Sequence, residues 1–356
     1  METITSPLPG AGAAAPATRP RWFRADNIRW FLIFNVIVEH MLTQTNITGN
    51  WLITVIVCWS RMITMPGFCF ISGYFSKKGD KCYQSAVFDF LVPYLIFNTL
   101  FVACFGTSAP NIFTPTFAYW YLVCMFCWKL CTKLLQQVKY IIPLSFIVAL
   151  AVGLCSGVDG VGRFLSLSRT IVFLPYYVIG MKMSRADVKK LEDLPKILVL
   201  VVTLAVMAVW GWLNVRGWFD IDFFYNWEPY AGMADDLSAF SYSIGKGLLL
   251  RVLGYIVSGV LIVFLFCLVP DRSLPVIRDG GTRTMVPFLL HTYFVMYVGI
   301  LYKYVPALDH WYITLPIALV MGVGLVCLLG LPILNDAYNW LIKFIKKIFY
   351  NDPAKT

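Results

Sequence analysis

The stretch "KILVLVVTLAVMAVWGWLNV", residues 196–215, decides the class of this protein. It carries a single charge, at its first position. At about 1.5 Å per residue, a helix of this length spans the ~30 Å hydrocarbon core of a bilayer. Two further runs have the same character: "LLLRVLGYIVSGVLIVFLFCLV" (248–269) and "ITLPIALVMGVGLVCLLGLPIL" (313–334). We therefore predict a helical integral membrane protein.

The composition of the whole chain agrees with this class. Of 356 residues, 59% are hydrophobic and 13% are charged, whereas soluble domains carry about 25% charged residues. Hydropathy indicates an all-α polytopic bundle of about ten transmembrane helices. The predicted spans are residues 28–46, 51–75, 86–105, 117–135, 140–156, 168–183, 197–215, 247–269, 284–302 and 311–334.

Most of the 29 basic residues lie at the start of the first predicted span or before it, or near the end of an even-numbered span or after it. They are Arg19, Arg21, Arg24 and Arg29; Lys77, Lys78 and Lys81; Lys129, Lys133 and Lys139; Lys182, Arg185, Lys189, Lys190 and Lys196; Arg272, Arg278 and Arg283; and Lys343, Lys346, Lys347 and Lys355. The positive-inside rule then places both termini in the cytoplasm. The net charge of +10 is thus expected to face membrane lipids. We expect no nucleic-acid partner, since no concentrated basic patch carries readout residues.

Three parts of the chain follow from these patterns. Residues 1–20 are rich in Pro, Ala and Gly and are expected to form a disordered cytoplasmic tail. We expect no cleaved signal peptide there, because no apolar core precedes a small-residue cleavage site. Residues 21–340 form a single transmembrane domain in this interpretation, and residues 341–356 form a basic cytoplasmic tail.

Four polar side chains are predicted at similar depth in the membrane. In "RWFLIFNVIVEHMLTQ" (29–44), His40 lies about 16 Å along the helix from Arg29. Arg61 lies about 15 Å into the second span and His291 about 12 Å into the ninth. With Glu39, these residues are candidates for one cluster, although depth does not establish that their helices are neighbours. The alternative is a buried pair that only fixes helix packing, but intramembrane ionisable residues are functional by default.

These residue types suit acyl or proton transfer. A histidine with an ordinary pKa of about 6.5 offers a neutral ring as base or nucleophile at neutral pH. Arg61 is positioned to stabilise an oxyanion in a dry site. Arg29 and the loop "SKKGDK" (76–81) offer cations for the phosphates of a cytoplasmic cofactor. No metal site is predicted, because no ligand set is complete.

Several segments together resemble the membrane acyltransferase 3 family. "IRWFLIFNVIVEH" (28–40) matches its arginine, ten residues, histidine pattern, and "MPGFCFISGYFSKK" (65–78) its Met-Pro and Ser-Gly-Tyr signature. "FLVPYLIF", "AYWYLVCMF", "FLPYYVIGMKM" and "FLLHTYF" resemble its later landmarks, so the likeness covers about residues 24–335. Thr64 stands where the family often has His, and Lys78 and Lys81 stand where it has Arg.

The resemblance implies a ten-helix O-acyltransferase similar to the fucose 4-O-acetylase-like group. Such enzymes take acetyl from cytoplasmic acetyl-CoA and place it on a sugar hydroxyl across the membrane, which implies a glycan acceptor and the plasma membrane. His40 would be the catalytic histidine, either as general base or as transient acyl carrier, with Arg29 as its motif partner. From their predicted depth, Arg61 and His291 are secondary catalytic candidates and Glu39 is a candidate orienting carboxylate. The signature and the basic loop together give Arg29, Ser72, Tyr74, Lys77, Lys78 and Lys81 as the expected cofactor-binding residues.

The connection 216–246 is longer than helix linkage requires and combines aromatic with acidic residues. Such groups suit a sugar platform, although an interfacial aromatic belt with solvating acids is equally consistent. The candidate substrate-binding residues are Trp218, Asp220, Asp222, Trp227, Glu228, Asp235 and Asp236.

Two other functions remain open at this point. A transporter or flippase of a glycan or lipid-linked saccharide also buries charges near the midplane. A scaffold that kept the fold and lost activity is the third interpretation. The acceptor, the acyl chain length and the oligomeric state are not readable from the sequence.

Overall fold

A computed structural model describes residues 21–106, 112–154, 162, 164–226, 229–230, 244–275, 277 and 279–349, and in these ranges all regular structure is helical. The predicted tail 1–20 lies outside them. The α-helices are α1 (Phe23–Thr43), α2 (Trp51–Phe75), α3 (Gly79–Ala86), α4 (Val92–Phe105), α5 (Trp120–Gln137), α6 (Ile141–Ala151), α7 (Leu167–Val172), α8 (Leu174–Lys182), α9 (Arg185–Glu192), α10 (Lys196–Val215), α11 (Ile244–Leu268), α12 (Met285–Tyr302), α13 (Trp311–Leu329) and α14 (Pro332–Phe349). The short helices are η1 (Asn46–Gly49), the π-helix η2 (Val87–Leu91), η3 (Val152–Leu154), η4 (Phe164–Ser166), η5 (Ile221–Tyr225), η6 (Gly280–Thr282) and η7 (Pro306–Asp309).

Each of the ten predicted spans falls on helix in the described ranges. The third falls on the continuous segment α3, η2 and α4, and the sixth on the broken pair α7 and α8. By length and composition, six helical segments among the described residues are able to cross a membrane, or seven if that pair, bent by 53°, counts as one span. The number of ten spans and the orientation of the termini therefore stay predictions.

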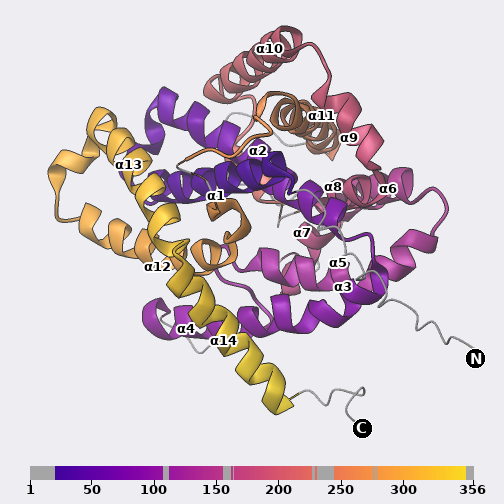
Figure 1. Cartoon of the computed structure of the whole chain (residues 1–356). Coiled ribbons are helices and arrows are strands. Elements are labelled where there is room, and N and C mark those ends of the chain that lie inside the picture. Colours follow the sequence, from indigo (N-terminus) through magenta and orange to yellow (C-terminus); the bar gives the residue numbers. More distant parts are fainter. Residues whose placement is uncertain are drawn as a thin grey trace, which may run out of the picture.

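α1 and α2 run through the middle of the molecule (Figure 1). They pack against each other, and α2 also contacts α8, α10 and α11, while α1 contacts α12 and α13. Most side chains of α1 are buried, including two charged ones, Asp26 and Glu39. Three of the four polar candidates, Glu39, His40 and Arg61, therefore lie on two largely buried helices, and the fourth, His291, lies on α12.

Two glycines bring α2 and α8 into backbone contact. A Cβ atom on Gly73 would lie 2.0 Å from the carbonyl oxygen of Tyr177, and one on Gly180 would lie 2.0 Å from that of Phe70. Small residues allow such close approach between membrane helices, where van der Waals packing drives association. The Ser-Gly-Tyr signature at the end of α2 thus includes a packing position, Gly73.

Local sequence explains two irregular points. Pro93 has no N–H to donate and lies at the start of α4, directly after the π-helical turn η2. At the start of α9, the Ser184 side chain accepts from the backbone N–H of Asp187, whose carboxylate accepts from Ser184 in return. This capping box satisfies two N–H groups and fixes where α9 begins.

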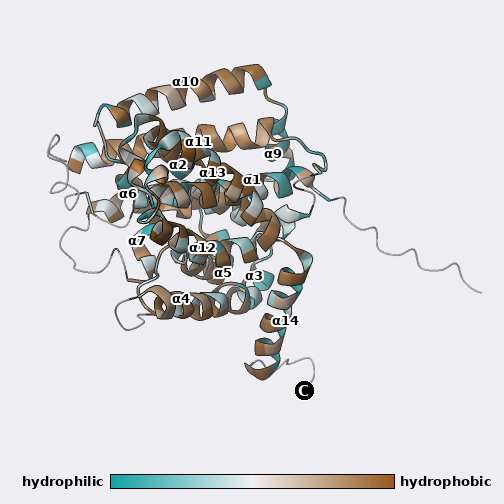
Figure 2. Ribbon diagram, turned by 90° about the vertical axis from the view of Figure 1, so that its left-hand side faces the viewer, coloured by the Kyte–Doolittle hydropathy of each residue, from teal (hydrophilic) through white to brown (hydrophobic). Residues whose placement is uncertain are grey.

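The outer surface is apolar on several helices. On α10 the exposed side chains include Ile197, Leu198 and Val201, and Figure 2 shows this helix as mostly hydrophobic. Apolar side chains that face outward suit contact with lipid. α14 includes residues 341–349 of the predicted tail and extends away from the bundle as a helix without buried residues (Figures 1 and 2).

Candidate functional site

A cavity of about 600 Å³, counting the part open to solvent, lies between α1, α2 and η5. We call it the central cavity. Its polar lining comes from Glu39 and His40 on α1, Arg61 and Thr64 on α2, and Tyr225 on η5. Its apolar lining includes Trp120, Phe173, Phe224 and Phe288. The cavity therefore combines apolar walls with a few placed polar groups, as small-molecule sites do.

The side chains of Glu39 and His40 form a pair. The Glu39 Oε2 atom lies 3.0 Å from His40 Nδ1, although consecutive residues of a helix project about 100° apart. The carboxylate accepts from Nδ1–H, and this fixes the tautomer in which Nε2 carries no proton in the neutral ring. His40 is thereby oriented as a base or nucleophile at Nε2.

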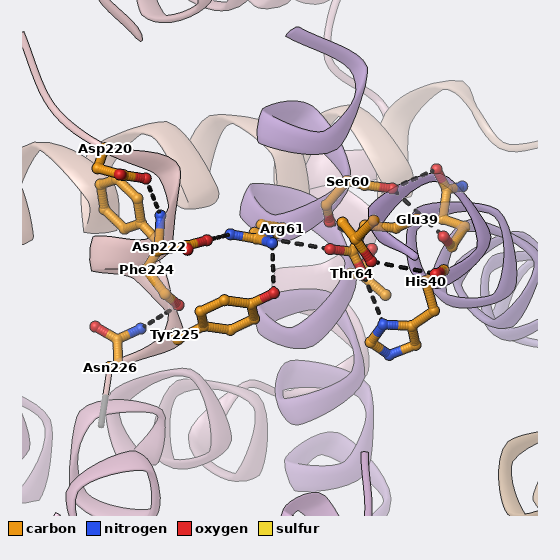
Figure 3. Close-up of polar contacts among 12 residues, drawn as sticks. Glu39, His40, Ser60, Arg61, Thr64, Asp220, Asp222, Phe224, Tyr225 and Asn226 are labelled. Carbon is orange, nitrogen blue, oxygen red and sulfur yellow. Dashed lines mark hydrogen bonds and ion pairs between the residues drawn. The ribbon is translucent and has the colours of Figure 1, made fainter. Parts of the chain in front are cut away.

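Arg61 holds the other oxygen of Glu39. Its Nε donates to Glu39 Oε1 at 3.0 Å, its Nη1 donates to Asp222 Oδ1 at 2.6 Å, and its Nη2 donates to the Tyr225 hydroxyl. Figure 3 shows the guanidinium between these partners, with Glu39 bridging Arg61 and His40. A guanidinium has five N–H donors, so Arg61 keeps N–H groups for a further acceptor.

The His40 ring is packed between two other rings. The His291 ring lies nearly parallel to it at 5.5 Å between centroids, and the Phe117 ring lies at 4.6 Å. The Nδ1 of His291 lies 2.8 Å from the carbonyl oxygen of Phe288. His291 is fully buried and does not line the central cavity. Phe117 has φ +47°, a conformation that costs energy for a bulky residue, and such strain often marks functional sites.

The predicted outer connection contributes one carboxylate to the cluster. Asp222 contacts Arg61, and the Asp220 side chain accepts from the Asp222 backbone N–H at 2.8 Å, so it caps η5. Trp218 is half exposed and does not line the central cavity. Trp227 and Glu228, and also Asp235 and Asp236, lie outside the described residues.

A second cavity, which we call the arginine cavity, holds Arg29 and Ser72. The Ser72 hydroxyl lies 2.9 Å from that of Tyr121, which also lines the cavity. Phe288 lines both the arginine cavity and the central cavity. Arg29 and His40, both on α1, thus line two cavities that share Phe288.

A third, open hollow lies beyond Arg29, and we call it the basic groove. The Arg29 guanidinium stacks over the Phe75 ring at 4.4 Å, and Phe75 lines the groove. Seven further residues that line the groove are Trp22, Tyr74, Lys77, Lys78, Lys81, Lys129 and Arg185. Burial lowers the pKa of Lys77 from its ordinary value. The predicted cofactor-binding residues therefore divide between two hollows that are linked by the contact of Arg29 with Phe75.

The structure adds residues that were not among the predicted site residues. Tyr225, Trp120 and Phe288 complete the central cavity, and Lys129 and Arg185 widen the basic groove. Lys129 is an isolated charge in an otherwise apolar run, so a hydropathy profile could have marked it as a candidate site residue. The aromatic residues carry no such signal, since aromatic side chains are common throughout this chain.

Among the described residues, no group of three or more His, Cys, Asp or Glu side chains has an arrangement that suits a metal ion. The polar groups of the central cavity instead pair with one another. Their arrangement supports proton transfer at His40 and anion stabilisation at Arg61.

Comparison with protein families gives a match over nearly the whole chain. Residues 22–335 match the acyltransferase domain of the acyltransferase 3 family. Comparison with curated proteins and with solved structures gives no match. The matched range contains all three hollows and the helices apolar enough to cross a membrane. The chain therefore belongs to the acyltransferase 3 family and is a multi-pass membrane acyltransferase.

Proposed function

We propose that the protein moves an acetyl group from cytoplasmic acetyl-CoA to a hydroxyl of a surface or lipid-linked glycan, in the plasma membrane. The observation that carries this proposal is the Glu39–His40 pair in the central cavity, which shares Phe288 with the arginine cavity, whose Arg29 in turn stacks over Phe75 of the basic groove. A donor with a charged head and a long arm matches this series of hollows.

The basic groove suits the head of coenzyme A. Exposed cations bind phosphates, and the groove carries Lys78, Lys81 and Arg185 beside the aromatic rings of Trp22 and Tyr74. Aromatic faces stack on nucleobases. The arm of the cofactor would then pass Arg29 in the arginine cavity and bring the thioester toward His40.

Two chemical routes fit this arrangement. In the first, His40 Nε2 takes the proton of the acceptor hydroxyl, and the acceptor oxygen attacks the thioester carbonyl. The C–S bond then breaks, and the CoA thiolate takes up the proton from the imidazolium. In the second, Nε2 attacks the thioester itself, the C–S bond breaks and CoA leaves as the thiolate. The acceptor oxygen then attacks the acyl carbon, the bond from that carbon to Nε2 breaks, and the hydroxyl proton goes to the CoA thiolate. In both, Glu39 fixes the ring, and the spare N–H groups of Arg61 face the developing oxyanion.

The test uses purified protein in liposomes, with labelled acetyl-CoA outside and mixed glycan acceptors. Wild type is compared with His40→Ala, Arg29→Ala and, as matched control, His310→Ala at the exposed start of α13. We expect label on sugar hydroxyls with wild type and His310→Ala, and none with His40→Ala. If no CoA is released with any acceptor and a glycan crosses the bilayer, the protein is instead a transporter. Binding of acetyl-CoA without any turnover would establish an inactive scaffold.

A further inference from the structure

A second buried arginine, Arg251, lies near the central cavity. It is the eighth residue of α11 and is 3% exposed. Its Nε, Nη1 and Nη2 atoms are all buried, and among the described residues none has a hydrogen-bond partner at ordinary geometry, although the guanidinium interacts with the Tyr230 side chain. Its guanidinium lies against two aromatic rings, 4.8 Å from that of Tyr230 and 5.5 Å from that of Phe223.

The other buried arginines show what Arg251 lacks. Arg61 has two carboxylate partners, and Arg169 donates from Nε to the carbonyl oxygen of Tyr225 at 2.8 Å. A guanidinium stays charged at any physiological pH, and removal from water without a hydrogen-bonding partner is strongly unfavourable. Aromatic faces offset only part of that cost. The site at Arg251 is therefore suited to a negatively charged occupant.

Arg251 lines its own small cavity, which adjoins the central one. This Arg251 cavity covers about 320 Å³, counting the part open to solvent, and is also lined by Asn226, Tyr255 and Ser258. Arg61, Phe173 and Phe224 line both it and the central cavity. An acceptor whose hydroxyl reaches His40 therefore lies beside the site of Arg251, where a small anionic group would replace water.

The position along the helix agrees with an acceptor-side role. Arg251 lies about 10 Å from the first residue of α11, Ile244, at the end of that helix where η5 also packs. Phe288 lines the central and arginine cavities but not the Arg251 cavity, whereas Arg61, Phe173 and Phe224 line the central and Arg251 cavities. A donor near Arg29 and an acceptor near Arg251 would thus adjoin different walls of the central cavity.

We propose that Arg251 binds an oxyanion, a carboxylate or a phosphate, carried by the acceptor glycan, so that the enzyme selects anionic acceptors. The proposal rests on the proposed acyl transfer and names the class of its acceptor. Charge-assisted contacts from a planar guanidinium to a carboxylate or phosphate are bidentate and strong. In this role Arg251 is a binding residue and takes no part in the proton transfer at His40.

The experiment measures binding first, by the thermal unfolding midpoint of purified protein in phosphatidylcholine vesicles. The probes are methyl glucuronide, glucose 1-phosphate and the neutral methyl glucoside. We expect the two anionic probes to raise the midpoint of wild type and of Arg216→Gln, an exposed arginine at the end of α10. We expect no rise with Arg251→Gln and a partial rise with Arg251→Lys, which keeps the charge. Equal responses of wild type and Arg251→Gln to each probe would overturn the proposal.

The second readout is acetyl transfer to the same three sugars. Because one charge-assisted contact is lost, we expect Arg251→Gln to raise the KM for the anionic acceptors roughly 10- to 100-fold. We expect kcat, and the KM for the neutral acceptor, to stay unchanged. A uniform loss with all acceptors overturns the inference but leaves the acyltransferase. No transfer to any sugar by wild type overturns the proposed function, whatever the binding result.

Two other sources of the anion are separate outcomes. If phosphatidylglycerol in the vesicles stabilises wild type but not Arg251→Gln, while the sugars have no effect, the anion is a lipid headgroup and the proposal fails. The chain's own carboxylates Glu228, Asp235 and Asp236 are the other source. The variant that replaces all three by Gln or Asn tests this source. If it lowers the unfolding midpoint as much as Arg251→Gln does, and the anionic probes bind equally to all variants, the proposal also fails.

Discussion

The basic groove and the central cavity both gather charge, but in opposite ways. In the groove, Lys78 and Lys81 are exposed cations, and water and salt reach them. In the central cavity the charges are buried and neutralise one another, with Glu39 held between Arg61 and His40. Screening weakens exposed charges at physiological salt and hardly affects buried pairs. The groove is therefore suited to capture an anionic ligand, and the cavity to chemistry that depends on geometry.

The largest effect is expected from a variant that breaks a buried charge pair of the central cavity. Glu39→Gln keeps the size of the side chain but removes the carboxylate that accepts from His40 Nδ1. We expect kcat to fall roughly 10²- to 10⁴-fold, the usual contribution of general acid–base catalysis, with the KM for acetyl-CoA nearly unchanged. Steady-state transfer kinetics in liposomes measure both.

Asp222→Asn is the matched control, because it also removes a carboxylate from Arg61 but leaves the pair of Glu39 and His40 intact. We expect a smaller loss of kcat with this variant. A Glu39→Gln enzyme that loses only affinity for acetyl-CoA would contradict the orienting role.

The second effect tests whether the two regions depend on one rigid helix. α2 carries Arg61 to the cavity and ends beside the groove, and it is held to α8 at Gly73. A Cβ at this position meets backbone, which cannot move aside as a side chain does. We expect Gly73→Ala to lower the free energy of unfolding by about 1–3 kcal/mol, the typical cost of overpacking. It should also reduce kcat and raise the KM for acetyl-CoA together.

Gly259→Ala serves as its control, since a Cβ at this position of α11 has no atom within 4 Å. Thermal unfolding followed by intrinsic fluorescence compares the two variants. Equal stability of both would show that α2 and α8 adjust without cost.

The third effect removes charge from the groove only. We expect Lys78→Ala combined with Lys81→Ala to raise the KM for acetyl-CoA about 10-fold at low salt and to leave kcat unchanged, because exposed ion pairs each contribute up to about 1 kcal/mol. The difference from wild type should shrink as salt rises. Lys343→Ala combined with Lys347→Ala removes the same charge from α14, which does not line the groove. A loss that is independent of salt would contradict electrostatic capture.

Sequence reasoning reached the depth of the cluster because the rise of a helix converts residue number into distance. The structure brings Glu39, His40, Arg61 and His291 together, which their similar depth allowed but did not establish. Their catalytic roles stay predictions. The direct bond between Glu39 and His40 was not predictable from angular spacing, since the long Glu side chain bridges the 100° between neighbours.

Other features depend on lateral packing, about which a single sequence carries little information. Arg251 stands in a run that the sequence marks as membrane-spanning, but only the structure shows that it lies beside the central cavity. Residues 341–349, the last part of α14, belong to the segment that was predicted only as a basic tail, on the basis of its lysines. The apolar residues Trp340, Phe344 and Ile348 of α14 recur at intervals of four, which is the signal that the charge count passed over.

The smallest effect concerns the capping box that positions Arg185 at the groove. Hydrogen bonds from the Ser184 hydroxyl and backbone N–H lower the pKa of Asp187 below its ordinary value of 3.8. A carboxylate with a lowered pKa stabilises the folded state fully above that ordinary value, and the contribution is lost as the pH falls through the lower, folded-state pKa. We expect Asp187→Asn to speed hydrogen exchange of the first α9 amides at pH 7, with the difference from wild type disappearing at the acid end of a pH series. Asp336→Asn in α14 should match wild type throughout. Because the groove attracts its ligand through several exposed charges, a frayed α9 should raise the KM for acetyl-CoA only a few-fold; a larger rise would mean that Arg185 is held in one geometry, as the buried charges of the central cavity are.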